Sequence, residues 1–427
     1  MQSAVSKFHL NNGLVVLLKE IHTSPIISHW IWYRVGSRNE RLGLTGISHW
    51  VEHMQFKGTS LFPSNVLDKA IAREGGIWNA FTYIDWTTYF ETMPADRIDL
   101  ALRLESDRLI NSLFDPEEVE SERTVIISER QGNENEPLFK LSEAMQAEAF
   151  KVHPYHHEVI GGMTDLLSIQ RDDLYQHYRG YYIPNNAVLA IAGDFETPIM
   201  QEKIIELYDH LPAGLQPDLD ISPEPPQPSE RQVVVHGPGE TTYLQVAHRV
   251  PSASHPDFYP LMVLDSLLTG PSNLNMFGGG ISNKTSHLYR VLVEAELAIG
   301  VQGGLHASID PFLHTITIIV HPERESEEVI QALKDEIQRL QDNQLQFEEL
   351  NRAVKQARAL FAYGSESITN QAFWLGYSEM FATYDWFLNY LDKLAGVTPE
   401  DVQRMAQKYF IPNNRTVGVY IPNGSEG

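Results

Sequence analysis

Apolar positions with two different spacings predict alternating strands and helices in the first half of the chain. Short apolar runs rich in valine, isoleucine and aromatic residues lie at 14–18 and 26–35, as expected of buried strands. Later segments have apolar residues three and four apart behind helix-start signals, which indicates amphipathic helices. The predicted helices span 45–56, 64–73, 96–110, 116–134 and 138–149.

The pattern recurs in the second half of the chain. Residues 181–193 and 409–421 both contain Ile-Pro-Asn-Asn followed by an apolar strand, and both come after an amphipathic helix with an acidic start. A repeat spaced by about half the chain predicts two similar domains. A stretch rich in proline and acidic residues separates them, as in a semi-rigid linker. We therefore predict a first domain at 1–215, a linker at 216–231 and a second domain at 232–427.

Composition narrows the class of protein. A chain of 427 residues with 42% hydrophobic content can bury sizeable cores. Its formal charge of −24 argues against nucleic-acid binding and favours cationic peptides as partners, although an acidic surface also serves solubility alone. No apolar run is long enough to span a membrane and no signal peptide is visible, so the expected location is cytoplasmic by default, with periplasmic or organellar locations left open.

Residues 49–53 read His-Trp-Val-Glu-His inside the helix predicted over 45–56. Positions i, i+3 and i+4 share one helix face, so His49, Glu52 and His53 project together. Two imidazoles four apart can hold one metal ion, and the carboxylate beside them can reach a water on that ion. An accidental match to this pattern is expected about 0.05 times in a chain of this composition. The motif therefore needs a third ligand to become a convincing metal site.

That ligand must be His, Asp or Glu, because the chain has no cysteine. The acidic stretch 115–130 starts like a helix and places Glu122 and Glu129 two turns apart on one face. Glu129 is the candidate third ligand, and Glu122 is a candidate acceptor that orients a ligand histidine. The alternative is a solvated acidic face, the commoner fate of such a run. Three protein ligands would leave one position open, as in catalytic rather than structural zinc sites.

Together these residues resemble the zinc signature of the pitrilysin/insulinase family of metallopeptidases. The stretches 46–59, 75–82 and 153–161 also match that family's pattern, and the resemblance covers nearly the whole chain. It is closest to the shorter, processing-peptidase-like members. The resemblance implies an α+β fold of two homologous α/β-roll domains, each a mostly antiparallel sheet with helices on one face, as in the mitochondrial processing peptidase-like metallohydrolases.

The resemblance also implies a function. His49, His53 and Glu129 would hold one Zn²⁺ per chain, and Glu52 would be the catalytic base of a zinc endopeptidase that cleaves unfolded peptides inside a chamber. A strand edge would bind the extended peptide, with Gly75 and Gly76 allowing the close approach before it. The implied substrate-binding residues are Asn79, Ala80, Phe81 and Thr82. A plain hairpin is the alternative interpretation of this segment.

The second domain departs from the family pattern. The helix position that carries the zinc motif in the first domain has no paired histidines here, and Ser286 and Ile299 stand where catalytic members have Arg and Tyr. Either Arg290 replaces the missing arginine, or this chain is the zinc-bearing subunit of a heterodimer whose homologous partner supplies the Arg/Tyr pair. We expect the second arrangement, with the glycines at 278–280 as a hinge, a lid segment or an ordinary loop. A self-sufficient homodimeric peptidase and a non-catalytic structural core subunit are the alternatives.

Overall fold

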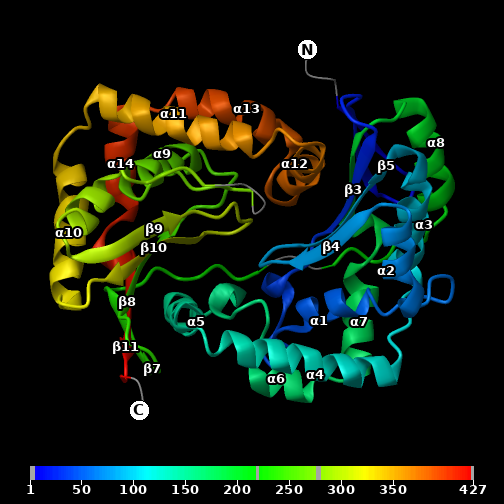
Figure 1. Cartoon of the computed structure of the whole chain (residues 1–427), viewed down its shortest axis with the longest axis horizontal. Coiled ribbons are helices and arrows are strands. Elements are labelled where there is room, and N and C mark those ends of the chain that lie inside the picture. Colours follow the sequence, from blue (N-terminus) through cyan, green and yellow to red (C-terminus); the bar gives the residue numbers. More distant parts are fainter. Residues whose placement is uncertain (1–4, 218–220, 276–279, 425–427) are drawn as a thin grey trace. The chain divides into compact units, whose positions relative to one another are not determined.

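Two β-sheets organise the chain, one in each of two compact units (Figure 1). The structure is a computed structural model that describes residues 5–217, 221–275 and 280–424. The units interleave along the sequence: the first comprises Met1–Gln131, His157–Ile221 and Glu366–Tyr384, and the second comprises Gly132–His156, Ser222–Ser365 and Asp385–Gly427. Since this division follows contacts and not the sequence, the boundaries at 1–215, 216–231 and 232–427 stay a prediction.

The sheet of the first unit has six strands in the order β1-β2-β6-β3-β5-β4. The β2–β6 pair is parallel, and the other four neighbouring pairs are antiparallel. The strands are β1 (Ser6–His9), β2 (Val15–Glu20), β3 (Ile26–Tyr33), β4 (Ile77–Thr82), β5 (Thr87–Pro94) and β6 (Ala187–Gly193).

Helices of the first unit agree closely with the predicted ones. Each of the four helices predicted in this unit begins and ends within two residues of the observed helix. The helices are α1 (Ile47–Met54), α2 (Ser64–Arg73), α3 (Ile98–Asn111), α4 (Pro116–Asn133), α6 (Met163–Ser168), α7 (Arg171–Tyr181), α8 (Thr197–Tyr208) and α12 (Ile368–Phe381).

Both faces of this sheet are covered by helices (Figure 1). In β3, His29 points to the side of α3 and α8, where the Tyr208 hydroxyl lies 3.4 Å from its ring. The neighbouring Trp30 and Trp32 point to the opposite side and contact Phe373 of α12. Burial on both faces explains why β3 and β6 are apolar almost throughout and do not alternate.

The sheet of the second unit has five strands in the order β7-β11-β8-β10-β9, which repeats the order β2-β6-β3-β5-β4 with its single parallel pair. The two Ile-Pro-Asn-Asn repeats lead into β6 and β11, which occupy equivalent central positions. The strands are β7 (Arg231–Gly237), β8 (Tyr243–Val250), β9 (Ala298–Gly304), β10 (Phe312–Val320) and β11 (Arg415–Pro422).

The second unit takes one helix from the first half of the sequence. That helix, α5 (Pro137–Ala149), packs on β7, β8 and β11. The other helices are α9 (Phe258–Leu268), α10 (Ser326–Asp342), α11 (Phe347–Tyr363), α13 (Tyr384–Ala395) and α14 (Pro399–Tyr409).

The predicted fold class, two homologous α+β domains with mostly antiparallel sheets, is confirmed. The prediction placed helices on one face of each sheet and is incomplete for the first sheet. Helix α12, which comes from a distant part of the sequence, packs on the second face of that sheet. Of the predicted linker 216–231, the described residues 216–217 and 221–230 form neither helix nor strand, and Arg231 is the first residue of β7. Across the described part of the chain, no helix is long and apolar enough to cross a membrane.

Candidate metal centre

Helix α1 carries the histidine motif, and its first turn is held in place by a buried carboxylate. Gly46 precedes the helix with a φ of +89°, and a Cβ at this position would lie 2.4 Å from the carbonyl oxygen of Ile160. The N–H groups of Gly46 and Ser48 each donate to one oxygen of Glu40 at 2.8 Å. Burial raises the pKa of Glu40 to about 8, although the two N–H donors act in the opposite direction. Glu40 thereby satisfies donors that a helix start leaves unpaired.

His49, His53 and Glu129 converge, with one ligand atom from each lying within 4.8 Å of the others. The Nε2 atoms of His49 and His53 lie 3.9 and 3.8 Å from the Glu129 carboxylate, which α4 supplies (Figure 1). Burial lowers the pKa of His49 to about 3, so its ring is neutral at pH 7 and offers a lone pair. Two imidazoles and one carboxylate, close enough to share an ion, fit a zinc ion with one open position.

Glu122 lies behind the histidines and contacts one of them directly. Its Oε1 atom is 2.8 Å from Nδ1 of His53. A carboxylate accepts hydrogen bonds, so this contact assigns the ring proton to Nδ1 and leaves the Nε2 lone pair directed at the ligand cluster. The other oxygen of Glu122 forms an ion pair with Lys57, just beyond the end of α1.

Glu52 projects from α1 beside the ligand cluster and is 8% exposed. The Thr82 hydroxyl donates to its Oε2 atom at 2.6 Å. Burial raises the pKa of Glu52 to about 7, and the Thr82 hydrogen bond acts against that rise. A carboxyl group whose pKa lies near neutrality can take up and release protons at physiological pH. The structure therefore gives Thr82 a contact with Glu52 in addition to its predicted place on the peptide-binding strand.

The predicted peptide-binding residues Asn79, Ala80, Phe81 and Thr82 lie on β4, the last strand of its sheet. Within the described residues, β4 pairs with β5 on one side, which leaves its other edge open. Asn79 is exposed and its side-chain oxygen accepts the N–H of Ala80 at 2.9 Å. Phe81 stacks on Phe90 with ring centroids 6.2 Å apart. The roles of these residues in binding substrate stay a prediction.

Two models of one peptidase family match consecutive parts of the chain. The model described as Insulinase (Peptidase family M16) matches residues 15–162, the stretch that contains the histidine motif and Glu129. The model described as Peptidase M16 inactive domain matches residues 168–357. The chain belongs to the insulinase family of zinc peptidases. The model described as inactive thus matches a part of the chain that lacks the histidine motif.

Relatives of this insulinase-family chain carry the names of zinc proteases and of processing-peptidase subunits. It is 32% identical to Zinc protease PqqE of Helicobacter pylori over 61% of its length, and 29% identical to the probable mitochondrial-processing peptidase subunit beta of Arabidopsis thaliana over 63%. These matches span 60% and 51% of the relatives' own lengths. The crystal structure of a protease from Helicobacter pylori superposes with a TM-score of 0.91 at 25% identity, covering 99% of this chain and all of that one.

In the second domain of this insulinase-family chain, Ser286 and Ile299 occupy the two positions where the resemblance led us to seek an arginine and a tyrosine. Ser286 is buried, and Ile299 on β9 is 55% exposed. Arg290 is exposed and donates to the carbonyl oxygen of Thr285 at 3.2 Å. Gly278 and Gly279, part of the predicted hinge, lie outside the described residues, whereas Gly280 is described. Among the described residues, the cluster on α1 and α4 is the one group suited to a metal ion.

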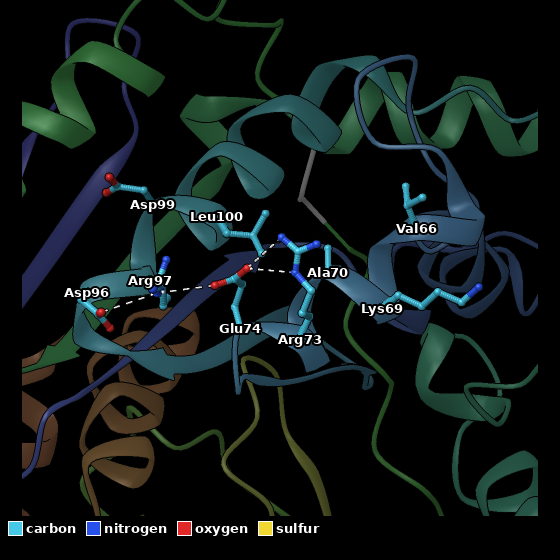
Figure 2. Close-up of a pocket in the computed structure, with 9 residues that line it drawn as sticks. All are labelled: Val66, Lys69, Ala70, Arg73, Glu74, Asp96, Arg97, Asp99 and Leu100. Carbon is cyan, nitrogen blue, oxygen red and sulfur yellow. Dashed lines mark hydrogen bonds and ion pairs between the residues drawn. The ribbon is translucent and has the colours of Figure 1, made fainter.

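A separate surface pocket of about 530 Å³ lies between α2 and the start of α3 (Figure 2). None of its nine lining residues belongs to the metal centre. Figure 2 shows the Glu74 carboxylate between the guanidinium groups of Arg73 and Arg97, at 3.3 and 3.5 Å. Arg97 also pairs with Asp96 at 3.5 Å. Since these charges largely satisfy one another, the pocket offers no evident binding chemistry.

Proposed function

We propose that this chain is a zinc-dependent endopeptidase in which His49, His53 and Glu129 hold one zinc ion per chain. The observation that carries the proposal is the convergence of these three ligand groups beside the buried carboxylate of Glu52. A structural zinc site would need a fourth protein ligand and no base. A non-catalytic core subunit of the same fold would have no reason to keep all four residues.

The chemistry divides between the ion and the side chains around it. Zinc, when bound, polarises the peptide carbonyl and makes a bound water acidic near neutral pH. Glu52 accepts the proton of the attacking water and later delivers it to the leaving amine. Thr82 orients Glu52 through its 2.6 Å hydrogen bond. Glu122 keeps the proton of His53 on Nδ1, so that Nε2 remains available as a ligand.

The substrate that fits this site is an unfolded peptide in extended form. The open edge of β4 can add a strand through main-chain hydrogen bonds, which recognise backbone and not a particular sequence. Asn79, exposed on that strand, is placed to contact the substrate backbone. The net charge of −24 favours basic peptides through long-range attraction. The enclosing chamber that the family resemblance implies stays a prediction.

Metal content and cleavage, measured on the same purified variants, test the proposal. Glu52→Gln is expected to keep one zinc per chain and to lower the cleavage of an unfolded fluorogenic peptide by about 100-fold or more. His53→Ala and Glu129→Gln should lose both zinc and cleavage. Glu117→Gln is the matched control, because Glu117 is an exposed glutamate on the same helix as Glu129. Retention of stoichiometric zinc in Glu129→Gln, or full cleavage by Glu52→Gln, would contradict the assignment.

We further propose that the chain is the zinc-bearing subunit of a two-chain peptidase. Support comes from the second domain, where neither Ser286 nor Ile299 can supply the positive charge or the phenol expected there. A homologous companion would provide these groups. A self-sufficient homodimer is the competing arrangement, with Arg290 as its candidate donor.

A further inference from the structure

Lys57 lies one turn beyond α1 and makes a contact that the proposed mechanism does not use. Its backbone N–H donates to the Met54 carbonyl at 3.0 Å, so its position is fixed by the end of the zinc-motif helix. Its ammonium group forms an ion pair with Oε2 of Glu122 and lies 3.8 Å from Glu118. The Lys57 side chain is 25% exposed, whereas that of Glu122 is 7% exposed.

The two oxygens of Glu122 have different partners. Oε1 accepts the hydrogen bond from His53, and the buried Oε2 forms an ion pair with the ammonium group of Lys57. Among the described residues, Oε2 has no hydrogen-bond partner besides this ion pair. Leaving a buried carboxylate oxygen without a partner costs free energy. Without Lys57, the Glu122 carboxylate would therefore rotate, or a water molecule would enter to pair with Oε2. Rotation would move Oε1 away from the ring of His53.

We propose that Lys57 is a positioning residue of the metal centre, which fixes the ring of His53 for zinc by holding Glu122 in place. This inference rests on the zinc site proposed above. Lys57 touches no ligand atom itself and acts through Glu122. The chain Lys57–Glu122–His53 joins the end of α1 to the middle of α4, and it therefore also fixes the distance between the two helices that supply the ligands.

A different role for Lys57 would be to offset acidic side chains at the start of α4. The residue also lines a surface pocket of about 500 Å³ that contains Asp115, Glu117 and Glu118. In that case its removal would change the stability of the chain and leave zinc binding unaltered. The two roles can therefore be separated by measuring zinc affinity and stability independently.

A double-mutant cycle on the full chain tests the proposal. Lys57→Met, Glu122→Gln and the double variant are depleted of metal, and their zinc dissociation constants are measured by competition with a chelating dye. Glu122→Gln and Lys57→Met should each weaken zinc binding by about tenfold or more, as loss of a ligand's supporting partner does. In the Glu122→Gln background, Lys57→Met should have less than about a twofold further effect. Lys57→Arg should recover most of the affinity.

Lys69→Met is the matched control, since Lys69 is an exposed lysine on α2 with no contact to the metal centre. Its zinc affinity should equal that of the unaltered chain. The proposal is overturned if Lys57→Met binds zinc with normal affinity, or if Lys57→Met weakens zinc binding equally with Glu122 and with Gln at position 122. It is also overturned if Lys57→Met lowers only the melting temperature of the metal-depleted chain and leaves the zinc affinity unchanged. Failure of the unaltered chain to bind zinc would instead overturn the proposed function and this inference together.

Discussion

At the scale of single residues, the candidate site depends on groups whose partners come from distant sequence. Glu52 on α1 receives its hydrogen bond from Thr82 on β4, and His53 receives its support from Glu122 on α4. Spacing within one helix predicts which side chains share a face, so the histidine motif was readable from sequence. The cap that Glu40 forms was not, because a loop residue six positions before Gly46 follows no helical period.

Replacing Thr82 with valine removes the hydroxyl that orients Glu52 while keeping the β-branched shape of the side chain. We expect kcat to fall about tenfold, the loss typical of one hydrogen bond to a charged group. Zinc content should change little, because the Thr82 hydroxyl contacts Glu52 and Thr87 and neither is a proposed metal ligand. KM should change little, because a peptide that adds to β4 would pair with its main chain. Thr82→Ser keeps the hydroxyl and should retain most of kcat. Steady-state kinetics with a fluorogenic peptide distinguishes the two, and a fall in zinc content would argue against this role.

Gly46 offers a second test at this scale, because Gly43 is a close control. Both glycines have φ near +90°, where any side chain is strained, but an added Cβ has open space at Gly43 and meets the Ile160 carbonyl at 2.4 Å at Gly46. Gly43→Ala should cost about 1 kcal/mol of unfolding free energy from strain alone, and Gly46→Ala at least about 1 kcal/mol more.

Chemical denaturation monitored by circular dichroism measures both variants. Zinc affinity should fall only in Gly46→Ala, since that residue sets the start of the helix that carries His49 and His53. Equal destabilisation by the two substitutions would show that the close approach to Ile160 is unimportant.

At the scale of elements, the sequence predicted helix positions better than helix neighbours. The observed ends of helices α1 to α5 agree with the predicted ones within two residues. Helix α12 is buried nearly all round, so its apolar pattern points in no single direction. Nothing in that pattern reveals that Phe373 packs against Trp30 and Trp32, more than 300 residues earlier in the chain. Such pairings depend on tertiary contacts that local periodicity does not encode.

The packing of α12 on β3 predicts opposite outcomes for one substitution in two helices. A Cβ on Gly376 of α12 would lie 2.1 Å from the indole nitrogen of Trp32, and that ring is fully buried. Gly376→Ala should therefore destabilise the fold by about 2 kcal/mol, as overpacking does. Gly180 in α7 has open space around it, so Gly180→Ala should stabilise by about 0.5 kcal/mol through helix propensity. Denaturation midpoints measure both, and a stabilising Gly376→Ala would contradict this packing.

At the scale of the whole molecule, two homologous domains have diverged in chemistry while keeping one strand order. The first carries the candidate base and the candidate ligands, and among the described residues the second offers no comparable metal-binding cluster. Ser286, at the position where an arginine was sought, is 2% exposed. A guanidinium group could not be accommodated at this buried position without repacking of the surrounding side chains. Under the two-chain proposal, the donor comes from a companion subunit.

The two-chain arrangement predicts a separation of metal binding from turnover. Purified alone, the chain should bind one zinc yet cleave a basic fluorogenic peptide slowly. Adding a homologous subunit with the Arg/Tyr pair should raise kcat by at least about 100-fold, the usual effect of supplying a donor to a developing oxyanion. A companion variant lacking its arginine is the matched control and should associate without activating. Arg290→Ala in this chain should have little effect on the assembled enzyme. Rapid cleavage by the isolated chain that depends on Arg290 would instead identify a self-sufficient peptidase, in which one chain supplies both the zinc site and the donor.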